Sequence, residues 1–332
     1  MPGNQLFKRF LKSLICKLFI IGHATEGESI VFLLCDGETV VYSCVVDSFT
    51  CEKEVVSEVI LKKLNISHIT DLFWTHPHDD HSAGITTLIE QYTPENIYIP
   101  DCLIKLPDDT QSISRDVLNE INKLNGYDRR CKNRQKVRVL GTGSLVHRGM
   151  LSVGAKKVYF EMITLAPSAG RLRSKVVKQT DQSGLNDLSI VLSIVIGDCV
   201  ILLTGDIQNG MIAWVRDDLV DLVDEVPVPN ILKIPHHGSK YSTEIFSLFE
   251  GDAEALEACK VDIGITTSKK SSSLPRAEAM KVYGARCGEL YQVDPDSSKL
   301  SIWGVDIDII AGKINGVNTE TEFGAANFVP YV

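Results

Sequence analysis

Half of the eight histidines of the chain lie between residues 68 and 81, and three of them fall in the segment His76–His81. Side chains two residues apart on an extended backbone point to the same side, so His76 and His78 can bind one metal ion together. Asp80 and His81 follow at the turn into a predicted helix, where they can offer an oxygen and a nitrogen to a second ion. The alternative, a histidine-rich surface turn, explains this combination poorly.

Further metal ligands are expected from two later segments. Asp206 follows the aliphatic run Val200–Leu203, and a buried carboxylate there needs a partner because an unpaired buried charge is costly. A position between two cations would satisfy it. His237 directly precedes Gly238, which lets the backbone approach a site closely. We therefore predict His237 as a ligand, and we expect His236 beside the ligands or in contact with substrate.

Alternating strand and helix patterns place these residues. Two β-branched runs, residues 29–34 and 39–46, flank Asp36-Gly37 and predict a hairpin. A helical pattern over residues 54–64 precedes a strand at 69–74, which leads directly into the histidine segment. Such alternation is typical of α/β folds, in which sites lie at the carboxyl ends of strands.

The second half of the chain repeats this organisation. Residues 188–196 and 199–203 flank Gly197-Asp198 as a second predicted hairpin, and a strand at 231–234 leads into the His236-His237 pair. Helices are predicted over residues 211–222, 244–249 and 277–283. Each half therefore contributes sheet and helices, and in each half strand ends deliver histidine or aspartate.

Two basic segments interrupt the pattern. Residues 129–138 carry six arginines and lysines, and residues 168–184 carry Arg171, Arg173, Lys175 and Lys178 with little apolar periodicity. We predict one domain over residues 1–332, with a helical and basic insertion at about 102–148 and a mobile basic loop at about 168–184. Solvated surface is one interpretation of both runs. The other is a basic lip that holds a phosphate backbone over the site.

Composition narrows the class of protein. Of the 332 residues 44% are hydrophobic, which is enough to form a hydrophobic core. The net charge is −9, so the overall charge of the chain does not attract nucleic acid. Nine cysteines without a Cys-x-x-Cys pair predict reduced thiols and a cytoplasmic protein. Lysines and an arginine interrupt the apolar residues 6–21, which argues against a signal peptide or membrane span.

These motifs resemble the metallo-β-lactamase fold superfamily. The His-x-His-x-Asp-His pattern of residues 76–81 matches its first metal motif, Asp206 its bridging aspartate, and Asp47 its early aspartate, which orients a motif histidine. The segments 184–192, 202–206 and 232–239 resemble the hydrolase domain of the bacterial competence DNA-uptake channel. The resemblance covers residues 18–310 and implies an αββα sandwich of two mixed sheets with helices on the outer faces.

The chain departs from the superfamily pattern at one ligand. Many members have another histidine between the first motif and the bridging aspartate, whereas this chain has only His147 there, which we interpret as a turn residue. The subgroup resemblance places Asn186 and Asp187 nearer the site instead. It implies two divalent metal ions, Zn²⁺ or Mn²⁺, with one ligand of the first ion unidentified.

The resemblance implies a metal-dependent hydrolase, and we expect a phosphodiesterase or nuclease that uses metal-activated water on nucleic acid or a nucleotide. The expected roles are as follows: catalytic groups at Asp80, His236 and Asn186; substrate contacts from Ser239, Lys240, Arg171 and Arg173; supporting contacts from Asp47 and Asp187.

Two alternatives stay open: hydrolysis of a lactam, lactone or thioester, and a binding or regulatory subunit with an incomplete metal site. A partner protein in a defence or toxin system is a further hypothesis. The sequence leaves the oligomeric state open.

Overall fold

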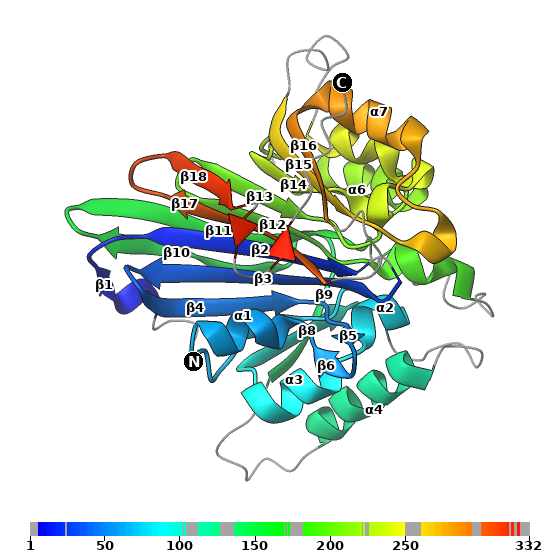
Figure 1. Cartoon of the computed structure of the whole chain (residues 1–332), viewed down its shortest axis with the longest axis horizontal. Coiled ribbons are helices and arrows are strands. Elements are labelled where there is room, and N and C mark those ends of the chain that lie inside the picture. Colours follow the sequence, from blue (N-terminus) through cyan, green and yellow to red (C-terminus); the bar gives the residue numbers. More distant parts are fainter. Residues whose placement is uncertain are drawn as a thin grey trace.

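The computed structural model of the chain describes residues 6–23, 25–101, 103, 112–126, 136–168, 170, 172, 182–220, 222, 226–249, 260–293, 300–318, 320–321 and 324–325. Two eight-stranded sheets form its centre, with helices beside them (Figure 1). Within the described residues, no helix is both long and apolar enough to span a membrane.

The first sheet combines an antiparallel half with a parallel half. Its strand order is β18(Lys313–Asn318), β17(Ser301–Asp308), β2(Ile15–His23), β3(Gly27–Asp36), β4(Thr39–Val46), β7(Asp71–Phe73), β8(Asn96–Pro100) and β9(Lys136–Leu140). Strands β4, β7, β8 and β9 are parallel to one another. Parallel strands need crossover connections, and these are α1(Ser57–Lys63), α2(Asp79–Ser82) with α3(Ile85–Tyr92), and α4(Ser112–Gly126).

The second sheet repeats this plan. Its order is β1(Phe10–Leu11), β10(Leu145–Val153), β11(Lys156–Ala166), β12(Val191–Ile196), β13(Cys199–Leu203), β14(Ile231–Lys233), β15(Val261–Thr267) and β16(Cys287–Val293). Its parallel strands, β13 to β16, are joined through α6(Asn209–Val220), the 3₁₀ segments η4(Pro235–Gly238) and η5(Lys240–Leu248), and α7(Ala277–Arg286).

Both faces of the central strands are buried. Residues 30, 32 and 34 of β3 belong to one apolar cluster with Phe160 of β11 and Ile194 of β12, so this cluster is the core between the sheets. The alternate residues 31, 33 and 35 share a second cluster with Ile60 of α1. Because side chains alternate along a strand, one continuous apolar run fills both layers. The predicted αββα sandwich is confirmed.

The remaining short elements lie at the edges and turns. They are η2(Leu6–Lys8), β5(Thr50–Cys51), β6(Glu54–Val55), η3(Gln182–Leu188), η7(Lys270–Ser272), β19(Glu320–Thr321) and β20(Gly324–Ala325). The helix predicted from residue 54 starts at Ser57, because residues 54–55 pair with β5 instead. The helix predicted at 244–249 is a 3₁₀ segment that already starts at Lys240.

Candidate metal centre

Five buried side-chain atoms from distant parts of the chain make no hydrogen bond to another described residue. They are His76 Nε2, His81 Nε2, Asp206 Oδ1, Asp206 Oδ2 and His237 Nε2, and Asp80 Oδ2 lies beside them, paired with the Lys269 ammonium. Buried polar atoms are nearly always satisfied, so an orphaned set needs a physical explanation. These atoms also converge: Asp206 lies 3.5 Å from His81 Nε2, 3.7 Å from His237 Nε2 and 3.9 Å from His76 Nε2.

The spacing fits donors arranged around cations. Two donors that each bind a tetrahedral ion at about 2.1 Å lie about 3.4 Å apart. His237 Nε2 lies 3.4 Å and His81 Nε2 3.8 Å from Asp80 Oδ2, and both distances exceed the usual length of a hydrogen bond. Among the described residues, three groups of possible donors have atoms within 4.8 Å of one another: His76, His78 and Asp206; Asp80, His81 and His237; and Asp47, His76 and His81. In the third group the Asp47 carboxylate is already bonded to Thr75 and His81 Nδ1, so the first two groups are the donor sets.

The fold explains this convergence, because each donor follows a strand of a parallel half. His76 lies just beyond β7 in the first sheet, while Asp206 and His237 follow β13 and β14 in the second. The main chain ties these ends together: His236 N donates to Gly205 O (3.1 Å), and Ile190 N donates to Thr75 O (3.1 Å). The centre therefore lies where the carboxyl ends of the two parallel halves meet.

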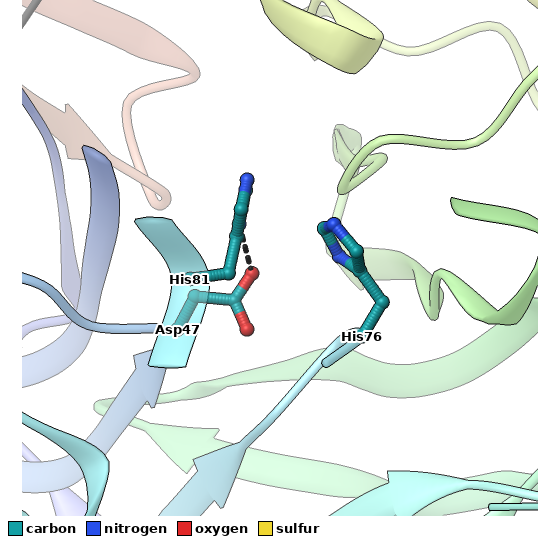
Figure 2. A group of neighbouring side chains, drawn as sticks. All are labelled: Asp47, His76 and His81. Atoms are coloured by element: carbon teal, nitrogen blue, oxygen red, sulfur yellow. Dashed lines mark hydrogen bonds and ion pairs between the residues drawn. The ribbon is translucent and has the colours of Figure 1, made fainter. Parts of the chain in front are cut away.

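Oxygen atoms hold the other ring nitrogen of three histidines. His81 Nδ1 lies 2.8 Å from Asp47 Oδ2, the contact drawn in Figure 2. His76 Nδ1 lies 2.9 Å from Thr75 Oγ1, and His237 Nδ1 lies 2.8 Å from Thr267 Oγ1. With Nδ1 engaged, each ring turns Nε2 toward the centre. Metal-binding histidines in proteins are typically held in this way.

The carboxylates and imidazoles of the centre shift one another's pKa. Burial raises the pKa of Asp206, but His237, His81 and His236 outweigh it and hold that pKa well below its usual range. Burial opposes a charge on His81, yet Asp206 and Asp80 raise its pKa well above the ordinary value. Burial lowers the pKa of His78 to about 4, so this imidazole is neutral at pH 7 and has a lone pair available for a metal ion.

The backbone around the centre is strained. Asp47, His236 and His237 have φ of 55°, 50° and 51°, which is rare for residues other than glycine. Such strain persists only where the surrounding structure enforces it, and it is concentrated at functional sites. Gly238 has φ of +75°, and a Cβ there would lie 2.6 Å from Pro275 Cβ. A Cβ on Gly27 would lie 2.1 Å from the carbonyl oxygen of Asp80, so glycine is required there too.

The other described residues that were predicted for the site lie in different environments. His236 and Asn186 lie beside the donors: Asn186 Nδ2 is 3.5 Å from His236 Nε2, which is 3.9 Å from Asp206 Oδ2. Ser239 is buried and accepts a hydrogen bond from Tyr241 N. Lys240 is exposed, with its ammonium 3.9 Å from Glu278. Asp187 is half-buried.

The two basic segments lie largely outside the described residues. Arg171, Arg173, Lys175 and Lys178 all fall there, as do residues 129–135. The described part of the predicted insertion comprises α4, β9 and the beginning of β10. The basic lip and the division of the domain therefore stay predictions.

His147 is not a turn residue, contrary to expectation. It lies within β10, and its Nε2 contacts Asp71 Oδ2 at 2.5 Å. The same carboxylate accepts hydrogen bonds from Tyr42 (2.5 Å) and Asn96 (2.8 Å). His147 is thus committed to a buried polar cluster that includes Asp71 of β7. Each donor set described above holds three residues without it.

Sequence reasoning missed Lys269 and Glu28. Lys269 follows β15, and its ammonium lies 2.5 Å from Asp80 Oδ2. Burial lowers the pKa of Lys269, but Asp80 and Asp206 raise it above the usual value, so this lysine is charged. Glu28 is buried and pairs with the fully buried Lys233 at 2.8 Å. Both pairs join residues far apart in the sequence, which no local pattern signals.

No protein-family model and no curated protein matches the chain. Among solved structures, it is similar to Igni18, a metallo hydrolase from Ignicoccus hospitalis, with 10% identity over 87% of this chain and 98% of that one (TM-score 0.41). It is also similar to CmlA, a diiron β-hydroxylase from Streptomyces venezuelae, with 12% identity over 83% of this chain (TM-score 0.36). The chain spans 44% of the length of that hydroxylase.

A third similar structure is the archaeal metallo-β-lactamase superfamily protein ST1585 from Sulfolobus tokodaii. The alignment has 13% identity and covers 57% of this chain and 62% of that one (TM-score 0.29).

Proposed function

We propose that this chain is a metal-dependent phosphodiesterase or nuclease. The observation that carries the proposal is the convergence of five unpaired, buried donor atoms on one centre, with the Asp80 carboxylate beside them. His76, His78 and Asp206 would hold one divalent ion, and Asp80, His81 and His237 the other. A carboxylate oxygen of Asp206 lies 3.5 Å from His81 in the second set, so Asp206 is suited to bridge both ions.

Divalent ions in such a pair activate water and neutralise the oxygens of the substrate. The protein's own groups act around them. His236 is only partly buried, with 16% of its side chain exposed, so it can contact a substrate oxygen. Burial lowers the pKa of His236, which leaves the ring largely neutral at pH 7 and able to donate one hydrogen bond and accept another.

Lys269 favours an anionic substrate. Its ammonium is largely buried beside Asp80, at the same centre as the donors. A lysine acts as a point charge for phosphate oxygens, and its burial strengthens that attraction relative to a solvated lysine. A phosphodiester carries such an oxygen next to the bond that breaks. A neutral lactone or thioester offers this lysine no corresponding charge, which is why we rank carbonyl substrates second.

The test is metal quantification on protein purified without chelator, followed by a substrate panel. The panel comprises single- and double-stranded DNA, RNA, cyclic nucleotides, a chromogenic lactam and a thioester, each with Zn²⁺, Mn²⁺ or Mg²⁺. We expect close to two ions per chain and cleavage of a phosphodiester that His76→Ala abolishes.

Cleavage of the lactam or thioester alone would replace the proposal with a carbonyl hydrolase. Metal well below one ion per chain with no turnover would favour a binding or regulatory protein. His68→Ala is the matched control, because His68 lies on the surface beside Glu95 and outside both donor sets. It should retain metal and activity.

A further inference from the structure

A buried ion pair lies directly behind the metal centre. Lys233 at the end of β14 is fully buried, Glu28 at the start of β3 is 1% exposed, and the ammonium lies 2.8 Å from Glu28 Oε2. Burying two charges costs more than an apolar pair of similar size, so stability alone does not account for this pair. Neither residue belongs to a donor set.

Thr267 connects this pair to His237. The Thr267 hydroxyl donates a hydrogen bond to Glu28 Oε2, and its oxygen lies 2.8 Å from His237 Nδ1. A hydroxyl has one proton to donate, and an ionised carboxylate can only accept. Toward His237 the Thr267 oxygen must therefore accept, so Nδ1 carries the ring proton. In this Nδ1–H tautomer the Nε2 lone pair faces Asp80 Oδ2 (3.4 Å) and Asp206 Oδ2 (3.7 Å).

The same arrangement recurs in the other sheet. Thr75 donates a hydrogen bond to Asp47 Oδ2 at 2.5 Å, and its oxygen lies 2.9 Å from His76 Nδ1. By the same reasoning His76 carries its proton on Nδ1 and presents Nε2 to Asp206, 3.9 Å away. In each case a threonine at or just beyond the end of a parallel strand links a buried carboxylate to one histidine of the centre.

We propose that Glu28, held by Lys233, is a positioning residue for His237. It acts through the hydroxyl of Thr267 and fixes the tautomer in which Nε2 is free to bind a metal ion. Lys233 keeps the carboxylate in place in a site that water does not reach. The inference rests on the proposed metal centre, because the fixed tautomer serves a ligand only if His237 is one.

The test replaces the hydroxyl by a methyl group of similar size, Thr267→Val. We expect the affinity for Zn²⁺ and Mn²⁺ of the site that contains His237, measured by competition with a chromophoric chelator, to fall about 10- to 100-fold, as for other losses of support to a ligand histidine. Thr267→Ser keeps the hydroxyl and should therefore retain the metal affinity of the wild type. Thr266→Val is the matched control, because Thr266 is equally buried and its hydroxyl donates to a backbone oxygen.

The second readout needs no metal. Long-range ¹H–¹⁵N NMR of metal-free protein at mildly alkaline pH should show His237 in the Nδ1–H form in the wild type and a mixture in Thr267→Val. The double variant Glu28→Gln, Lys233→Met should also show a mixture, without leaving one buried charge alone.

An unchanged tautomer together with unchanged affinity in Thr267→Val would overturn the inference while the metal centre stands. Wild-type protein that binds no metal would overturn the proposed function, and the tautomer measurement would still decide for or against the role of Glu28.

Discussion

Asp206 is the group whose loss should affect both metal positions at once. Its carboxylate lies 3.5 Å from His81 in one donor set and 3.9 Å from His76 in the other. Asp206→Asn keeps the size and removes the charge that would bridge two cations. We expect bound metal to fall from about two ions to one or fewer per chain.

The magnitude follows from linkage between binding and folding. An ion present at about 1,000 times its Kd stabilises the folded chain by about 4.1 kcal/mol. At about 2–4 °C per kcal/mol for a large domain, each lost ion lowers Tm by about 8–16 °C. The assay is thermal denaturation with saturating Zn²⁺ and with chelator, for wild type and variant. The metal-dependent gain in Tm should shrink by this amount in Asp206→Asn.

The matched control is Asp198→Asn, which makes the same change of charge at the exposed turn of the β12–β13 hairpin that leads to Asp206. It should keep the full metal-dependent gain. If Asp206→Asn still binds two ions and shows the same metal-dependent rise in Tm as wild type, the buried atoms without hydrogen bonds are not metal ligands.

Four further outcomes are expected. Asp47→Asn should weaken metal binding about 10- to 100-fold in chelator competition, because an amide nitrogen cannot accept the hydrogen bonds from His81 and Thr75. Lys269→Met should raise KM for an anionic substrate while metal content stays unchanged, and Lys269→Arg should recover part of the loss. Ile194→Ala in the core between the sheets should lower the free energy of unfolding by about 2–5 kcal/mol in urea titrations. Asp71→Ala should lower the free energy of unfolding by about 3 kcal/mol or more, because it leaves buried groups of Tyr42, Asn96 and His147 without their hydrogen-bond acceptor. It should leave the metal content unchanged.

Local patterns were sufficient for much of the fold. The hairpin at Asp36-Gly37 is present, with Gly37 at φ of +61°, because a tight turn between two β-branched runs has few alternatives. The strand that ends before His76 and the aliphatic strand before Asp206 were also predicted. Residue type and strand position were enough to nominate the donors, since aspartate and histidine are costly at the ends of buried strands unless something binds them.

Strand pairing and side-chain contacts between distant segments could not be predicted from local sequence patterns. The β10–β11 hairpin joins β1 on one side and β12 on the other, yet residue alternation there is blurred by exposed apolar side chains such as Met150 and Tyr159. For this reason His147 was interpreted as a turn residue, although it lies in β10. The contacts of Lys269 with Asp80 and of Glu28 with Lys233 depend on how the loops and strands of the two sheets pack together.

The centre draws its donors from both sheets, and this couples chemistry to the packing of the whole molecule. Sliding one sheet by a single residue would displace a donor by about 3.3 Å, further than any metal–ligand bond is long. A filled centre would therefore cross-link the two sheets. A substitution in the core between the sheets, far from the donors, should first be detected as faster release of the metal ions.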